Sequence, residues 1–326
     1  MLTSTHVPVL RLAQPQRSAR QQNYRRPFHS RRFAHNMDRS DRANEEVRPL
    51  PAATATSGAI PRLLILIPAF NEAGAIRHVV QSVRQVVPRA DIVVIDDGSK
   101  DNTRHEAAQA GAFVVRHPFN LGIGGTVQTG LKFARQHGYD YVIRLDGDGQ
   151  HNPQEIPLLL QALLEQRADA VFGSRFLGSK MTMQIPLARR LGITLFAWTV
   201  SFVTGQKATD TTSGFLGLNR AAITTLARFM PQDYPEVEGR IILHKAGLTT
   251  LELPTHMRMR MAGVSSIDKW RSIYYACKVT VAALICALKE IPVIPKEIRH
   301  GDTTRPTSYR HYLQPGFGAG DSPADP

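Results

Sequence analysis

The sequence predicts an α/β protein with a mostly parallel, Rossmann-like sheet and helices on both faces. Between residues 61 and 173, short apolar segments alternate with longer segments in which apolar residues recur every three or four positions. Three of the predicted strands run directly into polar clusters, at 68–72, 96–99 and 146–150. Because ligands of parallel sheets bind beyond the carboxyl ends of the strands, these clusters also predict where the functional site lies.

Five apolar runs have the length and the β-branched content of strands. They lie at 63–67, 91–95, 112–116, 141–145 and 170–173. Helices are expected between them, each opened by a residue or segment that suits a helix N-terminus. These openings are Asn71, Asp101, Gly122 and Pro153. Apolar residues at Ile76, Val79, Val80, Val83 and Val87 give the first helix one buried face, and Pro88 ends it.

The composition is that of an ordinary folded domain with a basic tail. The chain has 326 residues, of which 42% are hydrophobic and 21% charged, and its formal net charge is +13. More than half of this excess comes from residues 1–37, which hold seven arginines and no Asp or Glu. We expect a disordered Arg-rich tail and linker at 1–60, one α/β domain at 61–260, a C-terminal segment at 261–299 and a disordered tail at 300–326. A transit peptide and a start at Met37 are both compatible with the tail.

Several classes of protein and site are disfavoured. No folded basic face carries interleaved aromatic residues, so nucleic-acid binding is not expected. The Gly-rich segment 122–127 lacks the third glycine of a dinucleotide-binding loop and lies too late in the chain, and there is no Walker A motif. Cys277 and Cys286 are expected about 13 Å apart along one helix, and therefore unlinked. No run of 18 apolar residues occurs, so no membrane-spanning helix is expected.

Asp146 and Asp148 follow the predicted strand at 141–145, and Asp148 is expected to face solvent. Two carboxylates about 4 Å apart repel by roughly 4 kcal/mol at an effective dielectric constant of 20, so a divalent cation would stabilise such a pair. Oxygen ligands in an open loop favour Mg²⁺ or Mn²⁺, with substrate phosphates completing the coordination. An EF-hand is excluded because His151 and Pro157 occupy its Gly and Glu positions. An Asp/Gly turn that binds nothing is the alternative.

Four motifs, in their order and spacing, resemble family 2 inverting glycosyltransferases. They are L-I-P-A-F-N-E at 66–72, V-I-D-D-G-S-K-D-N-T at 94–103, N-L-G-I-G-G at 120–125 and L-D-G-D-G-Q-H at 145–151. The resemblance covers roughly residues 62–290 and is strongest to dolichol-phosphate mannose synthases and bacterial polyprenyl-phosphate sugar transferases. It implies a GT-A fold, a nucleoside-diphosphate sugar donor and a divalent metal.

The same resemblance implies the residues of the donor side. A metal on the donor diphosphate would be held by Asp146, Asp148 and Gln150, of which the two aspartates also count as catalytic. Nucleotide-sugar contacts are expected from Pro68, Phe70, Glu72, Asp96, Asp97, Gly98, Gly122 and Asp146.

On the acceptor side, D-T-T-S-G-F at 210–215 and R-M-R-M-A-G-V-S at 258–265 match motifs of these relatives. Two positions depart from the family pattern, namely Leu216 in place of Arg and Ile123 in place of Lys. A plain capping turn at 210–213 and an edge strand at 257–261 are the alternative interpretations. The implied acceptor-side residues are Asp210, Ser213, Gly214, Arg175, Arg258, Arg260 and Ser265, with Arg258 and Arg260 also counted as catalytic.

The chemistry of the acceptor separates two functions. A phosphate acceptor is already anionic and needs cationic contacts, which Arg258 and Arg260 can supply. A sugar hydroxyl instead needs a general base, and Glu236 or Glu238 lies where such a base is expected. We expect transfer of a hexose from a nucleoside-diphosphate sugar to dolichyl or undecaprenyl phosphate. A glycan-extending transferase of cell-surface polysaccharide synthesis, a sugar-nucleotide pyrophosphorylase and a non-catalytic binding subunit are the alternatives.

The segment from Trp270 to Ile291 is predicted to be a helix that is too short to span a membrane. Tyr274 and Tyr275 near its start, with Lys278 and Lys289, suit an interfacial helix, and a buried core helix is the alternative. We therefore expect a peripheral enzyme on the cytoplasmic face of a membrane. A small membrane-protein partner is a further expectation.

Overall fold

The computed structural model describes residues 61–177, 187–258, 269–295 and 312, with the backbone alone at 187–191 and 269–277. Arg260 and Ser265, both predicted on the acceptor side, lie outside these ranges. So do most of the two predicted tails. Strands and helices below are given for the described ranges.

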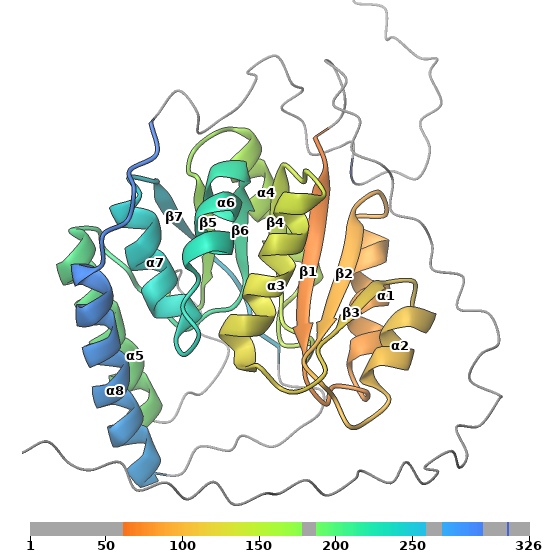
Figure 1. Ribbon diagram of the computed structural model, residues 1–326, viewed down its shortest axis with the longest axis horizontal. Coiled ribbons are helices and arrows are strands. Elements are labelled where there is room, and N and C mark those ends of the chain that lie inside the picture. The colour runs from red at the N-terminus through yellow and green to blue at the C-terminus, as the bar shows by residue number, and fades with distance from the viewer. Residues whose placement is uncertain (1–60, 178–186, 259–268, 296–311, 313–326) are drawn as a thin grey trace, which may run out of the picture. The chain divides into compact units, whose positions relative to one another are not determined.

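Seven strands form one mixed sheet in the order β3-β2-β1-β4-β6-β5-β7 (Figure 1). Their bounds are β1 Leu63–Ala69, β2 Asp91–Asp96, β3 Phe113–Arg116, β4 Tyr141–Arg144, β5 Ala170–Ser174, β6 Leu216–Asn219 and β7 Thr250–Pro254. The strands β1 to β4 pair in parallel, β6 runs antiparallel to both β4 and β5, and β7 is parallel to β5. The prediction of a mostly parallel sheet is confirmed, and all five expected strands are present.

The helices connect these strands and cover the sheet. They are α1 Ile76–Val86, α2 Thr103–Gln109, α3 Gly122–Gln136, a 3₁₀ turn at Pro153–Glu155, α4 Ile156–Leu164, α5 Leu187–Thr204, α6 Arg220–Phe229, α7 Pro235–Lys245 and α8 Lys269–Leu288. In the part of the chain that the structure describes, none of these helices is both long enough and apolar enough to cross a membrane.

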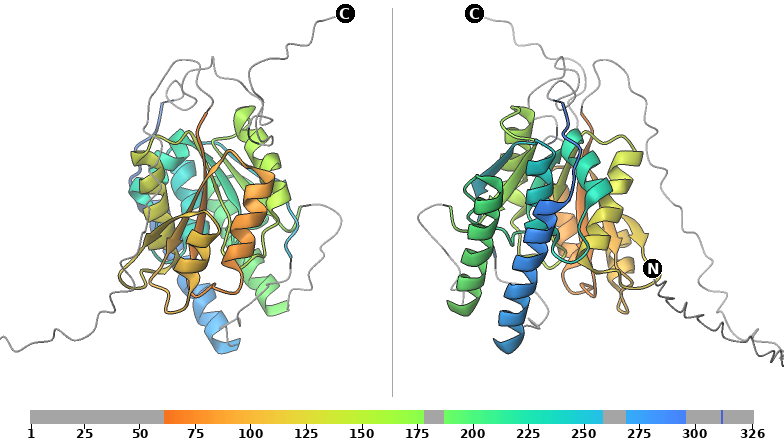
Figure 2. Two further views of the ribbon diagram at one scale, coloured as in Figure 1. Left: turned by 90° about the vertical axis from the view of Figure 1, so that its right-hand side faces the viewer. Right: turned by 60° about the vertical axis from the view of Figure 1, so that its left-hand side comes forward.

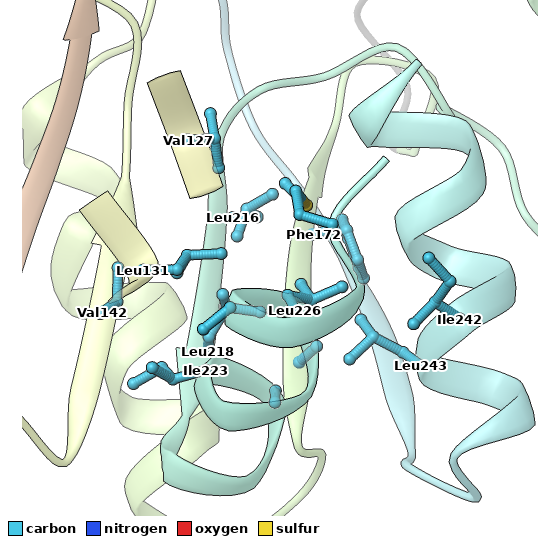
Figure 3. Close-up of a cluster of buried hydrophobic side chains, with 14 of the residues drawn as sticks. Val127, Leu131, Val142, Phe172, Leu216, Leu218, Ile223, Leu226, Ile242 and Leu243 are labelled. Atoms are coloured by element: carbon cyan, nitrogen blue, oxygen red, sulfur yellow. The ribbon is translucent and has the colours of Figure 1, made fainter. Parts of the chain in front are cut away.

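The alternation of side chains along the strands divides the core into two layers. Leu64 and Leu66 of β1 face one layer, which contains residues of α3, α5, α6, α7 and α8. Their neighbours Ile65 and Ile67 face the other, which is built mainly with α1 and α4. Figure 3 shows part of the first layer. Since neighbouring residues of a strand point to opposite faces, a continuously apolar strand such as β1 is what a sheet covered on both sides requires.

One expected helix cap is wrong. Asn71 has a positive φ of 55°, and its side chain accepts a hydrogen bond from the backbone N–H of Lys100 at 2.9 Å. The α1 helix begins five residues later, after a turn in which the carbonyl of Glu72 accepts from Ala75 and Ile76. Asn71 thus ties the first polar cluster to the second instead of starting α1. By contrast, Asp101 does accept from the backbone N–H of Thr103, at the start of α2.

The α5 and α8 helices pack side by side against the first core layer (Figure 2). On α8, Val279, Ala283 and Cys286 are buried, and the Cys286 thiol is free. Both helices also expose large apolar side chains, which are Leu195, Trp198, Phe202, Val281, Leu284, Ile285 and Leu288. One face of α8 is therefore in the core and another is open, and the interfacial interpretation stays a prediction.

Candidate active site

A cleft of about 280 Å³ opens at the carboxyl ends of β1, β2 and β4. This is the edge at which the sequence places the three polar clusters. The walls include most of the predicted donor-side residues together with five positions that were not predicted to bind. Its lining is Pro68, Ala69, Phe70, Glu72, Asp97, Asn120, Gly122, Ile123, Thr126, Asp146, Gly147 and Asp148.

Asp97 lies in the wall of the cleft and organises the start of α3. Its carboxylate accepts from the backbone N–H groups of Leu121 (2.8 Å) and Gly122 (2.9 Å). The ring of His117 lies 2.8 Å from Asp97 Oδ1 through Nδ1, and its other nitrogen lies 2.9 Å from the hydroxyl of Thr129. A carboxylate suits this place because a helix N-terminus presents N–H donors and a partial positive charge. The contact of Asp97 with the nucleotide sugar stays a prediction.

Asp96 and Gly98 support the cleft from outside its lining. Asp96 is buried, accepts from the backbone N–H of Ser99 at 3.0 Å, and lies 3.4 Å from the guanidinium of Arg116. Gly98 has a φ of +72°, and an added Cβ would come within 2.9 Å of the backbone of Phe119. Both residues therefore shape the loop, and neither is brought into the lining that the sequence predicted for them.

The two aspartates of the D-G-D turn differ in their exposure. The Asp146 side chain is 34% exposed, whereas Asp148 is 5% exposed and accepts from the backbone N–H of Gln150 at 3.0 Å. The expectation of a solvent-facing Asp148 is thus wrong, because its carboxylate turns onto the backbone of the following residues. Both carboxylates still line the same cleft, whereas Gln150 does not line it.

Arg144, the last residue of β4, lies directly beneath this turn with its side chain only 1% exposed. One guanidinium nitrogen donates to Asp146 Oδ1 at 3.1 Å and to Glu236 Oε1 at 2.9 Å. The burial of this group would lower its pKa, but the two carboxylates outweigh burial and raise it. Arg144 is therefore a fixed positive charge between the two carboxylates.

His151 closes the turn from below in its neutral form. Its Nδ1 accepts from the backbone N–H of Asp146 at 3.0 Å, and its ring stacks on Phe215 with 5.3 Å between centroids. Complete burial lowers the pKa of His151 below the usual value, even though Asp146 and Asp148 act in the opposite direction. The histidine of L-D-G-D-G-Q-H thus positions the backbone of the first aspartate.

The D-T-T-S-G-F motif reaches the same turn from the other side. A Cβ added to Gly214 would come within 2.6 Å of an Asp146 carboxylate oxygen, so only glycine fits there. Asp210 is fully buried and forms a two-point ion pair with Arg175, at 2.6 and 2.7 Å. Ser213 is also buried, and its hydroxyl accepts from the backbone N–H of Phe215 at 3.3 Å. Of these four predicted acceptor-side residues, Gly214 packs directly against a donor-side carboxylate, and Asp210 and Arg175 pair with each other.

Arg258 lies beside the D-G-D-G-Q-H turn. Met257 and His151 form an isolated antiparallel bridge, and the Arg258 N–H donates to the Gln150 carbonyl at 2.8 Å. The Arg258 guanidinium is exposed and donates to Asn152 Oδ1 at 2.8 Å. The alternative interpretation of this segment is an edge strand at 257–261. The described residues include only its first two positions, and the bridge at Met257 lies there.

The two glutamates considered as bases occupy different places. Glu236, in the first turn of α7, reaches Arg144 and through it Asp146. Glu238 is buried on the side of α8, 3.8 Å from the Lys289 ammonium, and burial raises the pKa of its carboxyl. Of this pair, only Glu236 is connected to the carboxylates of the cleft.

The sequence reasoning did not identify Arg144, His117, Asn120 and Thr126 as parts of the site. For Arg144 a signal was present, since a charged residue interrupts the otherwise apolar strand Y-V-I-R-L. Asn120 is the first residue of the N-L-G-I-G-G motif, whereas no local pattern predicts that Thr126 of α3 lines the cleft or that His117 contacts Asp97.

Comparisons with known proteins identify the class of this fold and site. A solved structure of glucosyl-3-phosphoglycerate synthase from Mycobacterium tuberculosis, in complex with Mn²⁺ and uridine-diphosphate-glucose, has a TM-score of 0.54 at 21% identity, covering 71% of this chain and 80% of that one. The fold is thus the GT-A fold of glycosyltransferases.

The sequence profile described as "Glycosyl transferase family 2" matches residues 64–226, and the chain belongs to this family. The protein is a glycosyltransferase, and the pyrophosphorylase alternative is set aside. It is 31% identical over 230 residues to the polyprenol monophosphomannose synthase of Mycolicibacterium smegmatis, covering 66% of this chain and 84% of that one. It is 30% identical over 211 residues to the UDP-N-acetylglucosamine–dolichyl-phosphate N-acetylglucosaminyltransferase of Methanococcus voltae, covering 59% and 84%.

Proposed function

We propose that this protein transfers a hexose, with inversion, from a nucleoside-diphosphate sugar to the phosphate of a polyprenyl lipid. The names of the two relatives both include a polyprenyl acceptor, and the donor cleft is formed by the motifs shared with the family. The observation that carries the proposal is the position of Arg258, whose backbone N–H donates to Gln150 at 2.8 Å and whose exposed guanidinium donates to Asn152 at 2.8 Å, directly after the D-G-D turn. A cation at this place suits an anionic acceptor oxygen.

Mg²⁺ or Mn²⁺ fits the donor set of the cleft. Within the described ranges, no group of three His, Cys, Asp or Glu side chains could hold a metal ion. The protein would therefore supply the carboxylates of Asp146 and Asp148, with Gln150 beside them, and the donor diphosphate would supply further oxygens. Hard cations that keep part of their coordination for substrate phosphates are bound in this way. When bound, such a metal stabilises the negative charge that develops on the leaving diphosphate.

The protein's own residues position the two reactants. Asp97 holds the start of α3 against the cleft, so that this wall is fixed before the donor binds. His151 and Gly214 hold Asp146 from two sides, and Arg258 lies where the acceptor phosphate can approach. Holding both reactants in line raises the rate, because little translational and rotational freedom is then lost on the way to the transition state.

The choice between a phosphate acceptor and a sugar hydroxyl can be measured with two variants. If the acceptor is polyprenyl phosphate, Arg258→Ala should slow transfer roughly ten- to a hundredfold, because a charge-assisted contact is worth about 1.5 to 3 kcal/mol. Glu236→Gln should cost less than tenfold, because the amide oxygen still accepts from Arg144. Mass spectrometry of the lipid product, with a panel of nucleotide sugars, measures both rates.

Arg220→Ala provides the control, since Arg220 forms an ion pair with Asp140 at 2.7 Å on the opposite edge of the sheet. The opposite rank order, with a loss of about 10² to 10⁴ in Glu236→Gln and a mild effect of Arg258→Ala, would establish the glycan-extending alternative. In that case the lipid-phosphate assignment is wrong.

We also propose that the enzyme works as a peripheral protein on the cytoplasmic face of a membrane and contacts it through the exposed side of α5 and α8. Trp198 and Phe202 are 64% and 72% exposed and stack on each other at 5.6 Å, and Leu288 on α8 is 83% exposed. Aromatic and aliphatic side chains gathered on one helical face are typical of interfacial binding. The small membrane-protein partner stays a prediction.

Sedimentation with vesicles tests this contact. We expect the wild type to sediment with phosphatidylcholine vesicles at 1 M salt, where charges are screened beyond about 3 Å and the basic tail contributes little. The double variant Trp198→Ser/Phe202→Ser should lose most of this binding. Leu158→Ser, which changes an exposed residue of α4 on the other face of the sheet, is the matched control. Equal sedimentation of all three proteins would exclude the α5–α8 face as the contact.

A further inference from the structure

Arg144 is a charged residue inside an apolar layer of the core. It alternates along β4 with Val142, on the side of the sheet covered by α3 and α6, and apolar side chains such as Leu131 and Phe172 line the small cavity next to it. Two of its guanidinium nitrogens, Nε and Nη1, are buried and make no hydrogen bond. Burial of an arginine with incomplete hydrogen bonding costs free energy, so packing alone would favour an apolar residue here.

The third guanidinium nitrogen, Nη2, makes both of the polar contacts. It lies 3.1 Å from Asp146 Oδ1 and 2.9 Å from Glu236 Oε1. Asp146 follows β4 and faces the donor cleft, whereas Glu236 is in the first turn of α7, 92 residues further along the chain than Arg144. A single planar cation therefore joins a carboxylate of the donor side to the helix that begins behind the cleft.

The surroundings leave this group little freedom. Gly214 packs against the pair so closely that an added Cβ would come within 2.9 Å of Arg144 Nη2 and within 2.6 Å of Asp146. The side chains of Asp146 and Glu236 are 34% and 20% exposed, so both keep access to solvent and substrate. Arg144 itself is closed off beneath them and cannot touch a substrate.

We propose that Arg144 is a positioning residue for the transfer reaction, which holds Asp146 and Glu236 in one fixed arrangement. Through Arg144, the Asp146 carboxylate in the cleft and the start of α7 are held by one guanidinium group. The consequence is that the two carboxylates do not act independently. Loss of Arg144 and loss of the Glu236 carboxylate should then have overlapping effects on the rate, while metal binding itself persists.

A double-mutant cycle tests this coupling. Arg144→Met should reduce the transfer rate about 10- to 100-fold, the effect expected for one charge-assisted contact, while melting close to the wild-type temperature because methionine fills an apolar site. Glu236→Ala should slow transfer more than Glu236→Gln, which keeps an oxygen to accept from Arg144. The double variant Arg144→Met/Glu236→Ala should be no slower than Arg144→Met alone, since contacting residues that act as a unit are not additive.

A second readout separates positioning from metal affinity. Titration of each variant with Mn²⁺ alone, followed by electron paramagnetic resonance, gives the concentration that saturates the site. We expect the defect of Arg144→Met to persist at saturating Mn²⁺. Arg62→Met is the control, because Arg62 is a partly buried arginine paired with Asp91 at 3.8 Å at the opposite end of the sheet. It should transfer at the wild-type rate.

Two results would overturn the proposal, namely multiplicative losses in the double variant, or full recovery of Arg144→Met at saturating Mn²⁺. If Arg144→Met does not fold, the comparison of Glu236→Ala with Glu236→Gln remains decisive, and equal rates for the two would count against the shared anchor. The inference rests on the proposed function only in one respect, which is the use of polyprenyl phosphate as the acceptor in the assay. If no polyprenyl phosphate is glycosylated, the same cycle can be measured on release of nucleoside diphosphate from the donor in the absence of acceptor.

Discussion

Replacement of Asp148 by Asn is expected to reduce transfer about 10³-fold or more, because loss of one metal carboxylate removes several kcal/mol of transition-state stabilisation. The fold should be retained. Asp148 is 5% exposed and accepts from the Gln150 N–H at 3.0 Å, and the side-chain oxygen of Asn can accept the same hydrogen bond. The measurement is the initial rate of lipid glycosylation at saturating nucleotide sugar, beside thermal unfolding of both proteins.

Treatment of the wild type with EDTA should produce a similar loss, and addition of Mg²⁺ or Mn²⁺ should restore the rate. The same addition should not restore Asp148→Asn. Wild-type rates in metal-free buffer, or full activity of Asp148→Asn, would contradict the metal-dependent mechanism.

The largest expected effect on stability is that of Asp210→Ala. This change leaves the guanidinium of Arg175 buried without the carboxylate that it contacts at 2.6 and 2.7 Å, and removal of one partner of a buried ion pair costs about 3 to 5 kcal/mol. Chemical denaturation, with the free energy of unfolding extrapolated to water, measures the loss. Asp233→Ala is the control, because Asp233 pairs with Lys278 on the surface at 3.5 Å and such pairs contribute about 1 kcal/mol or less.

The same ion pair gives the stability a defined pH dependence. Burial would raise the pKa of Asp210, but the hydrogen bonds and the charge of Arg175 outweigh it and hold the pKa below the ordinary value of 3.8. A carboxyl group with a lowered folded-state pKa stabilises the protein above its unfolded-state pKa, and this stabilisation is lost as the pH falls through the folded-state value. The wild type should therefore lose more stability than Asp210→Ala as the pH falls below about 4. Parallel curves for the two proteins would contradict this.

The sequence by itself determined the class of fold and the edge of the sheet that carries the site. A continuously apolar β1, an amphipathic α1 and polar clusters at three strand ends are local patterns, and local patterns are enough to predict a parallel sheet covered by helices. They were also enough to predict that the polar clusters at 68–72, 96–99 and 146–150 meet at one edge, because parallel strands end at the same edge, whereas the resemblance to the family singled out Phe70, Glu72 and Asp97 within them.

Only the tertiary structure decided which long-range contacts hold that site. Asn71 suits a helix cap by composition, yet its contact with Lys100, 29 residues away, takes precedence. Glu236 and Glu238 are equivalent in the sequence, and the turn of α7 directs one to Arg144 and the other toward Lys289. Arg144 meets Glu236 only because β6, antiparallel to β4, leads the chain away from the cleft and α6 then returns it to the start of α7. The free energy of a buried charge depends on partners brought together by packing, and no pattern of neighbouring residues contains them.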